Sequence, residues 1–328
     1  MAEPKKKGCF GCSFPLIIII GIVLLALFSF GLIGGALGRN LLGDIGLGFL
    51  NVPQPHPELP PEIVFHIFGF PITNSVIGAW ITVVFLVLFS WAITRRLKLI
   101  PNRLQSLFEY LLGWLHDFCG SVAGEKHGRV FFPIVATLFL FVAFNAWLSL
   151  IPGFGSIEID GLRFHEGHWV PATVHLIRGA NTDINMPLAL AISSFFIVLF
   201  IGLKTLGPRY LEQYLNLRQL FRGLGQMFRG KLKDGFMGLF LGAIEAFVGI
   251  LELLSHLIRV LSLTFRLFGN MTAGEILLLV TAFLIPWLFA LPFYGLELLV
   301  GFLQAMIFAG LTLIYLTMAV AGHGEESH

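Results

Sequence analysis

Charge is what this 328-residue sequence lacks most. Only 12% of its residues are Asp, Glu, Lys or Arg, whereas 56% are hydrophobic. A soluble globule of this length needs more polar surface than so few charges supply, so the composition predicts a chain whose solvent is lipid. The net charge of +2 indicates no nucleic-acid partner, because the distribution of the charges along the chain matters more than their sum.

Cysteine is also scarce, and its three residues, Cys9, Cys12 and Cys119, exclude a disulfide framework. The CxxC pair of Cys9 and Cys12 would need two further ligands at a sensible spacing to hold zinc, and none lies nearby. We interpret the pair as ordinary thiols close to the membrane. The sequence therefore predicts neither a metal site nor a cofactor.

Long apolar runs are what the sequence has instead. A bilayer core of roughly 30 Å is crossed by about 20 helical residues. Six runs meet this length, at residues 14–37, 72–94, 131–151, 184–203, 236–285 and 293–321. Pro286 and Pro292 bracket the turn between the last two, because proline cannot continue a helix. We predict an all-α polytopic membrane protein with about six membrane segments, the fifth of them unusually long.

The basic residues predict the orientation of these spans, since cytoplasmic loops retain Lys and Arg. With the N-terminus placed inside, 16 of the 21 Lys and Arg residues fall in inner segments. Three fall outside, at Arg39, Arg163 and Arg178, and two lie within the membrane, at Arg259 and Arg266. Both termini are therefore predicted to be cytoplasmic.

The division of the chain follows from these spans. Residues 1–38 form either an N-terminal membrane anchor or a signal sequence that is later removed. Residues 39–71 form an outer proline-rich segment, residues 72–321 the membrane domain, and residues 322–328 a cytoplasmic tail. The basic segment from Lys204 to Asp234 mixes cations with Leu, Phe and Tyr, so it either lies along the inner membrane surface or is a solvated loop.

Arg266 is the residue whose position most needs an explanation. Apolar sequence flanks it for several turns on both sides, so its side chain has no short route to a headgroup. An unpaired arginine at bilayer depth costs roughly 3 to more than 10 kcal/mol, and such residues are usually paired, hydrated or functional. We predict that Arg266 is functional.

A polar stripe surrounds this arginine. Glu245, Glu252, Arg259 and Arg266 recur every seven residues, a spacing that keeps them on one helical face. His256 and Ser262 fall close to the stripe and extend it with titratable and hydroxyl groups. One alternative stays open, namely that Glu252 only pairs with a neighbour on the helix as a structural brace.

A second set of polar residues lies toward the outer side. Glu275 is nine residues beyond Arg266, which corresponds to roughly 13 Å along a helix and about half a turn out of phase. Glu297 begins the last span and Gln304 follows on the same face seven residues later. Because a short outer turn joins the last two spans, Glu275 and Glu297 are expected to share an outward-facing aqueous cavity.

Three further polar residues occur at the same outer level: Asn145, Asp183 and Asn185. With them, the pattern consists of an inner polar track, an outer polar track and an arginine between the two. This pattern predicts two half-channels that do not meet, so a mobile part must carry the proton from one to the other.

The segment Ser262 to Glu275, SLTFRLFGNMTAGE, resembles the signature of subunit a of bacterial F-type ATP synthases. The resemblance extends to FFPIVATLFLFVAFNAWLSLIPGF at 131–154, TDINMPLALA at 182–191 and LQAMIFAGLTLIYLTMA at 303–319. It covers most of residues 72–321. It does not reach the first span or the basic loop.

The resemblance implies a role for each matching residue. Arg266 would face a ring of c subunits, attract each ring carboxylate and stabilise its ionised form, so that the carboxylate passes only after losing its proton. Gln304 would orient Arg266, Asn270 would line the same region, and Glu252 would lie at the cytoplasmic half-channel. The fifth helix would be strongly tilted, and the sixth would pack with it as a hairpin against the ring.

The same resemblance implies a setting for the chain. It would be a non-catalytic, proton-translocating subunit in the bacterial inner membrane, surrounded by lipid. Its partners would be the c-ring, the peripheral-stalk b subunits and the rest of the F1Fo complex. One departure is visible, because family members often pair a carboxylate with a histidine where this chain has Glu275 and Glu297. These two acids are expected to titrate as a coupled pair. The choice between proton and sodium stays open.

Two other classes of protein remain as alternatives. An autonomous ion or solute transporter would also place Arg, Glu and Asn along an intramembrane path, but it would conduct without a partner. An intramembrane transferase would use the outer histidines, His165, His168 and His175, whose spacing matches no metal motif.

Overall fold

The computed structural model describes residues 14–42, 54, 60–95, 97–98, 100–151, 157–165, 168–207, 210 and 232–321. Outside this description lie the Cys9 and Cys12 pair, residues 43–53 and 55–59 of the proline-rich segment, most of the basic segment after Lys204 and the tail from residue 322. The chain divides into two compact units. The first comprises the residues up to Pro60 together with Met271–Val300, and the second comprises Pro61–Asn270 and the residues from Gly301 onward.

The predicted all-α membrane fold is confirmed. The helices are α1 (Phe14–Gly34), α2 (Ala36–Leu42), α3 (Asn74–Thr94), α4 (Arg103–Ser149), α5 (Asn185–Leu206), α8 (Leu232–Leu284) and α9 (Leu291–Ala321). Six of the described helices are long and apolar enough to cross a membrane. The predicted long fifth segment is α8, with 53 residues, and the turn between Pro286 and Pro292 contains the short 3₁₀ helix η3 (Trp287–Ala290).

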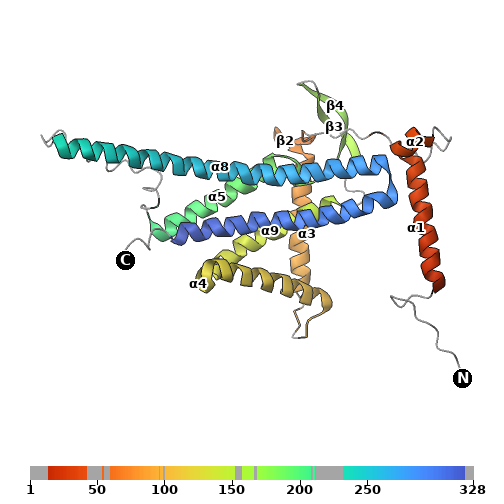
Figure 1. Cartoon of the computed structure of the whole chain (residues 1–328), viewed down its shortest axis with the longest axis horizontal. Helices are drawn as coiled ribbons and strands as arrows, with labels where there is room; N and C mark the ends of the chain where they lie inside the picture. The colour runs from red at the N-terminus through yellow and green to blue at the C-terminus, as the bar shows by residue number, and fades with distance from the viewer. Residues whose placement is uncertain are drawn as a thin grey trace. The chain divides into compact units, whose positions relative to one another are not determined.

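Helix α4 is longer than the predicted third span and folds back on itself. Gly124 has φ 75° and ψ 159°, values that interrupt the helical backbone and that glycine adopts without strain. Past this point Gly128 lies against the backbone of Cys119 and Gly120, so the chain reverses direction (Figure 1). The first arm, from Arg103 to Gly124, was not predicted, because its charged residues break the apolar run that marks a span.

A four-stranded antiparallel sheet was not predicted either. Its order is β2-β1-β3-β4, with β1 at Ile63–Ile67, β2 at Phe70–Thr73, β3 at Glu158–His165 and β4 at His168–His175. Strand β1 joins the two hairpins by pairing Ile63 with Leu162 of β3. The connection before α3 and the connection between α4 and α5 therefore lie on the same side of any membrane that α3 and α4 cross.

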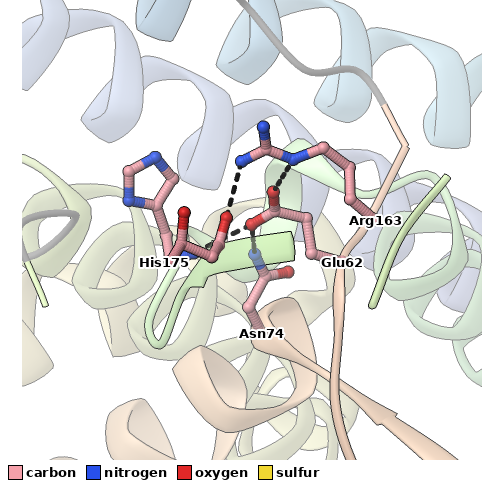
Figure 2. Close-up of polar contacts among 5 residues, drawn as sticks. Glu62, Asn74, Arg163 and His175 are labelled. Carbon is pink, nitrogen blue, oxygen red and sulfur yellow. Dashed lines mark hydrogen bonds and ion pairs between the residues drawn. The ribbon is translucent and has the colours of Figure 1, made fainter. Parts of the chain in front are cut away.

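Glu62 fixes this sheet to the start of α3. Its carboxylate is 2% exposed and accepts hydrogen bonds from Arg163 Nε at 2.9 Å, Asn74 Nδ2 at 3.2 Å and the backbone N–H of His175 at 3.0 Å (Figure 2). A buried charge is tolerated only when it is paired and hydrogen-bonded, as it is here. The cluster draws together two parts of the chain, residues 62–74 and 163–175, that are far apart in the sequence.

The first unit has its own packing. Helix α1 contacts η3, and Gly35, at the bend between α1 and α2, lies directly against the backbone of Leu284 at the end of α8. The C-terminal end of α1 and the turn between α8 and α9 are therefore neighbours. Most other side chains of α1 are exposed and apolar, as expected for a helix surrounded by lipid.

Candidate functional site

The predicted polar stripe lies on a single continuous helix, α8. Its members Glu245, Glu252, Arg259 and Arg266 are all half-buried, whereas large apolar side chains next to them on α8 are exposed. Phe247, Leu254, Leu261 and Phe265 are examples of this exposed apolar face. The stripe therefore runs along the boundary between the packed side of the helix and its open side.

Arg266 lies at this boundary. Its neighbours Leu263, Thr264 and Leu267 are buried, while Phe265 is 57% exposed. Arg266 Nη2 donates a long hydrogen bond of 3.4 Å to Ser262 Oγ, one turn earlier on the same helix. This contact brings together two residues that the sequence predicted for the site. A bond of this length constrains a guanidinium only weakly, so most of its five N–H donors remain available to another group.

Gln304 of α9 meets α8 one turn beyond Arg266. Its side chain is 2% exposed, and its Oε1 accepts a hydrogen bond of 2.7 Å from Asn270 Nδ2. The resemblance implies that Gln304 faces Arg266 and orients it, and the hydrogen bond that the structure shows for Gln304 is with Asn270. This bond joins α8 to α9 at the level of the arginine.

An inner cluster continues the stripe toward the start of α8. Glu252 Oε1 and His256 Nε2 are 3.4 Å apart, which is the pairing that the sequence left open as a brace. The His256 ring lies 5.8 Å from the ring of Phe195 on α5. The guanidinium of Arg259 lies over the ring of Tyr315 on α9, 5.1 Å from its centroid, in a cation–π contact.

These inner residues border a small cavity between α5, α8 and α9. Its polar lining includes Ser194, His256, Arg259 and Tyr315. Beside it, Ser194 Oγ and Thr312 Oγ1 share a buried hydrogen bond of 2.9 Å, while Thr312 Oγ1 also bonds to the carbonyl oxygen of Phe308. The four polar side chains converge on a cavity whose other lining residues are apolar, an arrangement that suits a single ordered water molecule.

A second group of polar residues joins α3, α4, α5 and the short helix η2 (Ala180–Thr182). We call Ser75, Thr82, Asn145, Asn181 and Asp183 the outer polar cluster, after the side of the membrane that the sequence predicts for them. All five are at most 5% exposed. Asn145 Nδ2 donates to Thr82 Oγ1 at 3.0 Å, and Asn145 Oδ1 accepts from the backbone N–H of Asn181 at 3.3 Å.

Asp183 is the acceptor at the centre of this cluster. Its Oδ2 accepts from Ser75 Oγ at 2.7 Å, and its Oδ1 accepts from the backbone N–H and Nδ2 of Asn185 at 3.1 and 3.0 Å. Asn181 is different, because neither atom of its buried amide has a hydrogen-bond partner among the described residues. The structure thus brings Asn145 and Asp183 into one hydrogen-bonded cluster and gives each of them partners within the chain.

The two predicted outer acids lie in the first unit. Glu297 is 6% exposed, and its carboxylate lies so close to Gly274 that a Cβ atom there would overlap it. Gly274 immediately precedes Glu275, which is half-buried. The structure therefore places Glu297 against the backbone of α8 beside Glu275, and the sequence can place no larger residue than glycine at position 274 without moving the acid.

Several residues at these positions were missed by sequence reasoning. Tyr315, Ser194 and Thr312 looked like ordinary members of apolar spans, and Thr82 gave no sign of its bond to Asn145. The partners Glu62 and Arg163 are 101 residues apart, so no local pattern could connect them. The outer histidines lie in the sheet, where His165 is opposite His168 and His175 ends β4.

The fold and the site define a multi-span membrane protein with charged and amide side chains placed along its longest helix. Residues 76–317 match the family described as ATP synthase A chain. ATP synthase subunit a 1 of Pelobacter propionicus is 34% identical over 255 residues, which are 78% of this chain and 89% of that protein. ATP synthase subunit a of Desulfosudis oleivorans is 31% identical over 278 residues, or 83% and 99% of the two chains. The chain belongs to the ATP synthase subunit a family.

Proposed function

We propose that this chain is the ion-translocating stator subunit of a rotary F-type ATP synthase, with two offset proton half-channels and Arg266 between them. The observation that carries the proposal is the position of Arg266 on α8. The residue sits at the border of an exposed apolar helix face with most of its hydrogen-bonding capacity available. Its relatives in Pelobacter propionicus and Desulfosudis oleivorans are named as subunits of ATP synthase.

The exposed face of α8 supports a rotor as the missing partner. Side chains such as Phe240, Val248 and Leu254 are each about half exposed, although they belong to the longest helix of the chain. A ring of c subunits would cover this face and bring its carboxylates past Arg266. The arginine would stabilise each carboxylate in its ionised form and repel hydronium, which prevents a direct leak between the half-channels.

The inner half-channel would follow Glu252 and His256 to the polar cavity beside α5. We assign Asn145 and Asp183 to the outer one, and likewise the acids Glu275 and Glu297 of the first unit. The buried amide of Asn181 supports an outer water path, because buried polar groups without a protein partner are those that ordered water satisfies. Each elementary charge that crosses 100 mV releases about 2.3 kcal/mol, so the voltage drop is useful only if Arg266 keeps the two paths apart.

The topology and setting are part of the same proposal. We place the chain in a bacterial inner membrane with both termini in the cytoplasm, as a non-catalytic subunit that also contacts the peripheral-stalk b subunits. The contact of the α1–α2 bend with the end of α8 supports the retention of α1 as an anchor on which the outer turn rests. A length of 53 residues supports a strong tilt for α8, because at 1.5 Å per residue it far exceeds the membrane thickness.

The test is ATP-driven proton pumping by the complete complex in vesicles. Arg266→Ala should abolish pumping while the complex still assembles and hydrolyses ATP. Arg259→Ala is the matched control, since it removes an equal charge from the same helical face two turns away. Pumping by Arg266→Ala at the level of Arg259→Ala would contradict the proposal. Conduction by the chain alone in liposomes would favour an autonomous transporter.

A further inference from the structure

The hairpin formed by β1 and β2 has two ends of opposite character. At its base, Ile63 and Val64 are each 7% exposed and lie against the rest of the sheet. At its tip, residues 65–71 are all exposed. The strands themselves contain no Asp, Glu, Lys or Arg, and His66 is the only titratable residue between positions 63 and 73. The hairpin therefore has a buried base and an exposed, mostly apolar tip.

The base is held in a fixed position. The Glu62 carboxylate receives three hydrogen bonds (Figure 2). In addition, the backbone N–H of Asn74 donates to the carbonyl oxygen of Glu62 at 3.0 Å. Asn74 is the first residue of α3, and its side chain is completely buried. Because the start of the hairpin and the start of α3 are bonded to each other, the tip stays at a set height relative to α3.

The tip presents aromatic rings at its most prominent positions. Phe68 is 98% exposed and Phe70 is 74% exposed, with Phe65 and Ile67 about 40% exposed beside them. Phe68 and Gly69 form the turn with φ values of 50° and 86°. A bulky residue in this left-handed region is uncommon, and a two-residue turn of this kind usually starts with Asn, Asp or Gly. The chain thus accepts an unfavourable backbone conformation at the position where a phenylalanine projects.

The other hairpin of the same sheet is a natural comparison. Strands β3 and β4 carry Glu158, Asp160 and Arg163, and the two acids are exposed. These charges suit contact with water. One sheet therefore combines a charged hairpin with an uncharged aromatic one, and the uncharged hairpin is the one that leads directly into a membrane-spanning helix.

We propose that the tip of the β1–β2 hairpin inserts into the headgroup region of the leaflet at which α3 begins, and anchors that end of α3 to the lipid. Lipid is the favoured occupant because β2 is continuous with α3 and because no charge interrupts the apolar surface between them. Aromatic side chains are enriched at this boundary of the bilayer. The anchor concerns lipid alone and does not depend on Arg266 or on rotation.

Quenching of a fluorescent label tests the insertion. In the assembled complex in phosphatidylcholine–phosphatidylglycerol vesicles, with Cys9 and Cys12 replaced by serine and buried Cys119 retained, a polarity-sensitive label is attached at His66→Cys or at Glu158→Cys. His66 leaves all the aromatic residues of the tip in place. Lipids spin-labelled near the headgroup should quench the label at position 66 several times more than iodide does, and the label at position 158 should show the reverse.

A second pair of variants tests whether the aromatic side chains hold the hairpin tip in the lipid or whether the tip only lies near the lipid surface. Phe68→Ser with Phe70→Ser, in the His66→Cys background, should reduce the lipid quenching severalfold, while Phe68→Leu should retain it. Iodide quenching at position 66 equal to that at position 158 would overturn the proposal. Shielding of position 66 from both quenchers would overturn it as well, because the tip would then be covered by another protein subunit.

Discussion

Two regions of this chain place polar side chains in or next to its long apolar helices, and the surroundings of these side chains differ. In the outer polar cluster, Asn145 and Asp183 are each 3% exposed and bonded to neighbouring helices. On α8, Arg259 and Arg266 are half-buried at the edge of an exposed apolar face. The first region obtains its partners by folding. In the second region, Arg266 still has N–H donors available for a group that does not belong to this chain.

The difference separates residues that stabilise the protein from residues that act in it. A buried polar group is costly unless it is bonded, so removing one member of the outer polar cluster should weaken the fold. A half-exposed charge contributes little to folding but is free to interact with a passing group. Substitutions on α8 should therefore impair transport more than stability, and substitutions in the outer polar cluster should do the reverse.

After Arg266→Ala, the largest effect is expected for Arg266→Lys. Lysine retains the charge but lacks the planar fork of donors and loses its proton more readily when desolvated. ATP-driven pumping should fall by about 100-fold, which corresponds to roughly 2.7 kcal/mol of lost interaction. The thermal stability of the purified complex should stay unchanged. If the variant pumps well, any positive charge is sufficient at this position. If its melting temperature falls, Arg266 stabilises the fold as the residues of the outer polar cluster do.

Asp183→Ala is the corresponding test in the outer polar cluster. It leaves Ser75 Oγ and both donors of Asn185 without their acceptor, which should destabilise the chain by about 2 kcal/mol. The melting temperature of the solubilised complex measures this loss. Asp183→Asn retains an acceptor and should recover most of the stability. Asp183→Asn should also still pump, because water in the proposed outer path can carry protons past a single acid. A stable Asp183→Asn variant that does not pump would show that this carboxylate is essential to transport, against the contrast drawn between the two regions.

Gly274→Val tests the placement of Glu297. The new side chain would overlap the Glu297 carboxylate, so it should displace the acid and slow pumping several-fold, as Glu297→Gln should. The effect is smaller than that at Arg266 because water can carry protons past a single acid. Gly295→Ala is the control, since the space around Gly295 is open. Equal slowing by both variants would contradict the contact.

The smallest effect is expected for Ser194→Ala. The change removes the hydrogen bond to Thr312, while Thr312 Oγ1 still donates to the carbonyl oxygen of Phe308. The stability should fall by about 1 kcal/mol, the usual net contribution of one hydrogen bond. The melting temperature should drop slightly and the pumping rate should stay close to that of the parent. A large loss of pumping would assign Ser194 to the inner proton path.

Much of the fold was predictable because membrane helices leave strong local signals. Apolar length located the six helices among the described residues that are long and apolar enough to cross a membrane, and the prolines at 286 and 292 located the turn before α9. The first arm of α4 and the four-stranded sheet were missed for one reason. Both are formed by polar or short segments whose stability depends on contacts made elsewhere in the chain, which no window of sequence contains.

The candidate site, like the fold, has a part that the sequence predicts and a part that only the tertiary structure shows. The sequence by itself determined that Arg266 and its companions share one face of one helix, because a spacing of seven residues and a helical pitch are sufficient for that conclusion. Only the tertiary structure decided that Asn270 bonds to Gln304, that Tyr315 lies under Arg259 and that Glu62 pairs with Arg163. These contacts join residues between 34 and 101 positions apart, so they exist only once the helices and strands have packed.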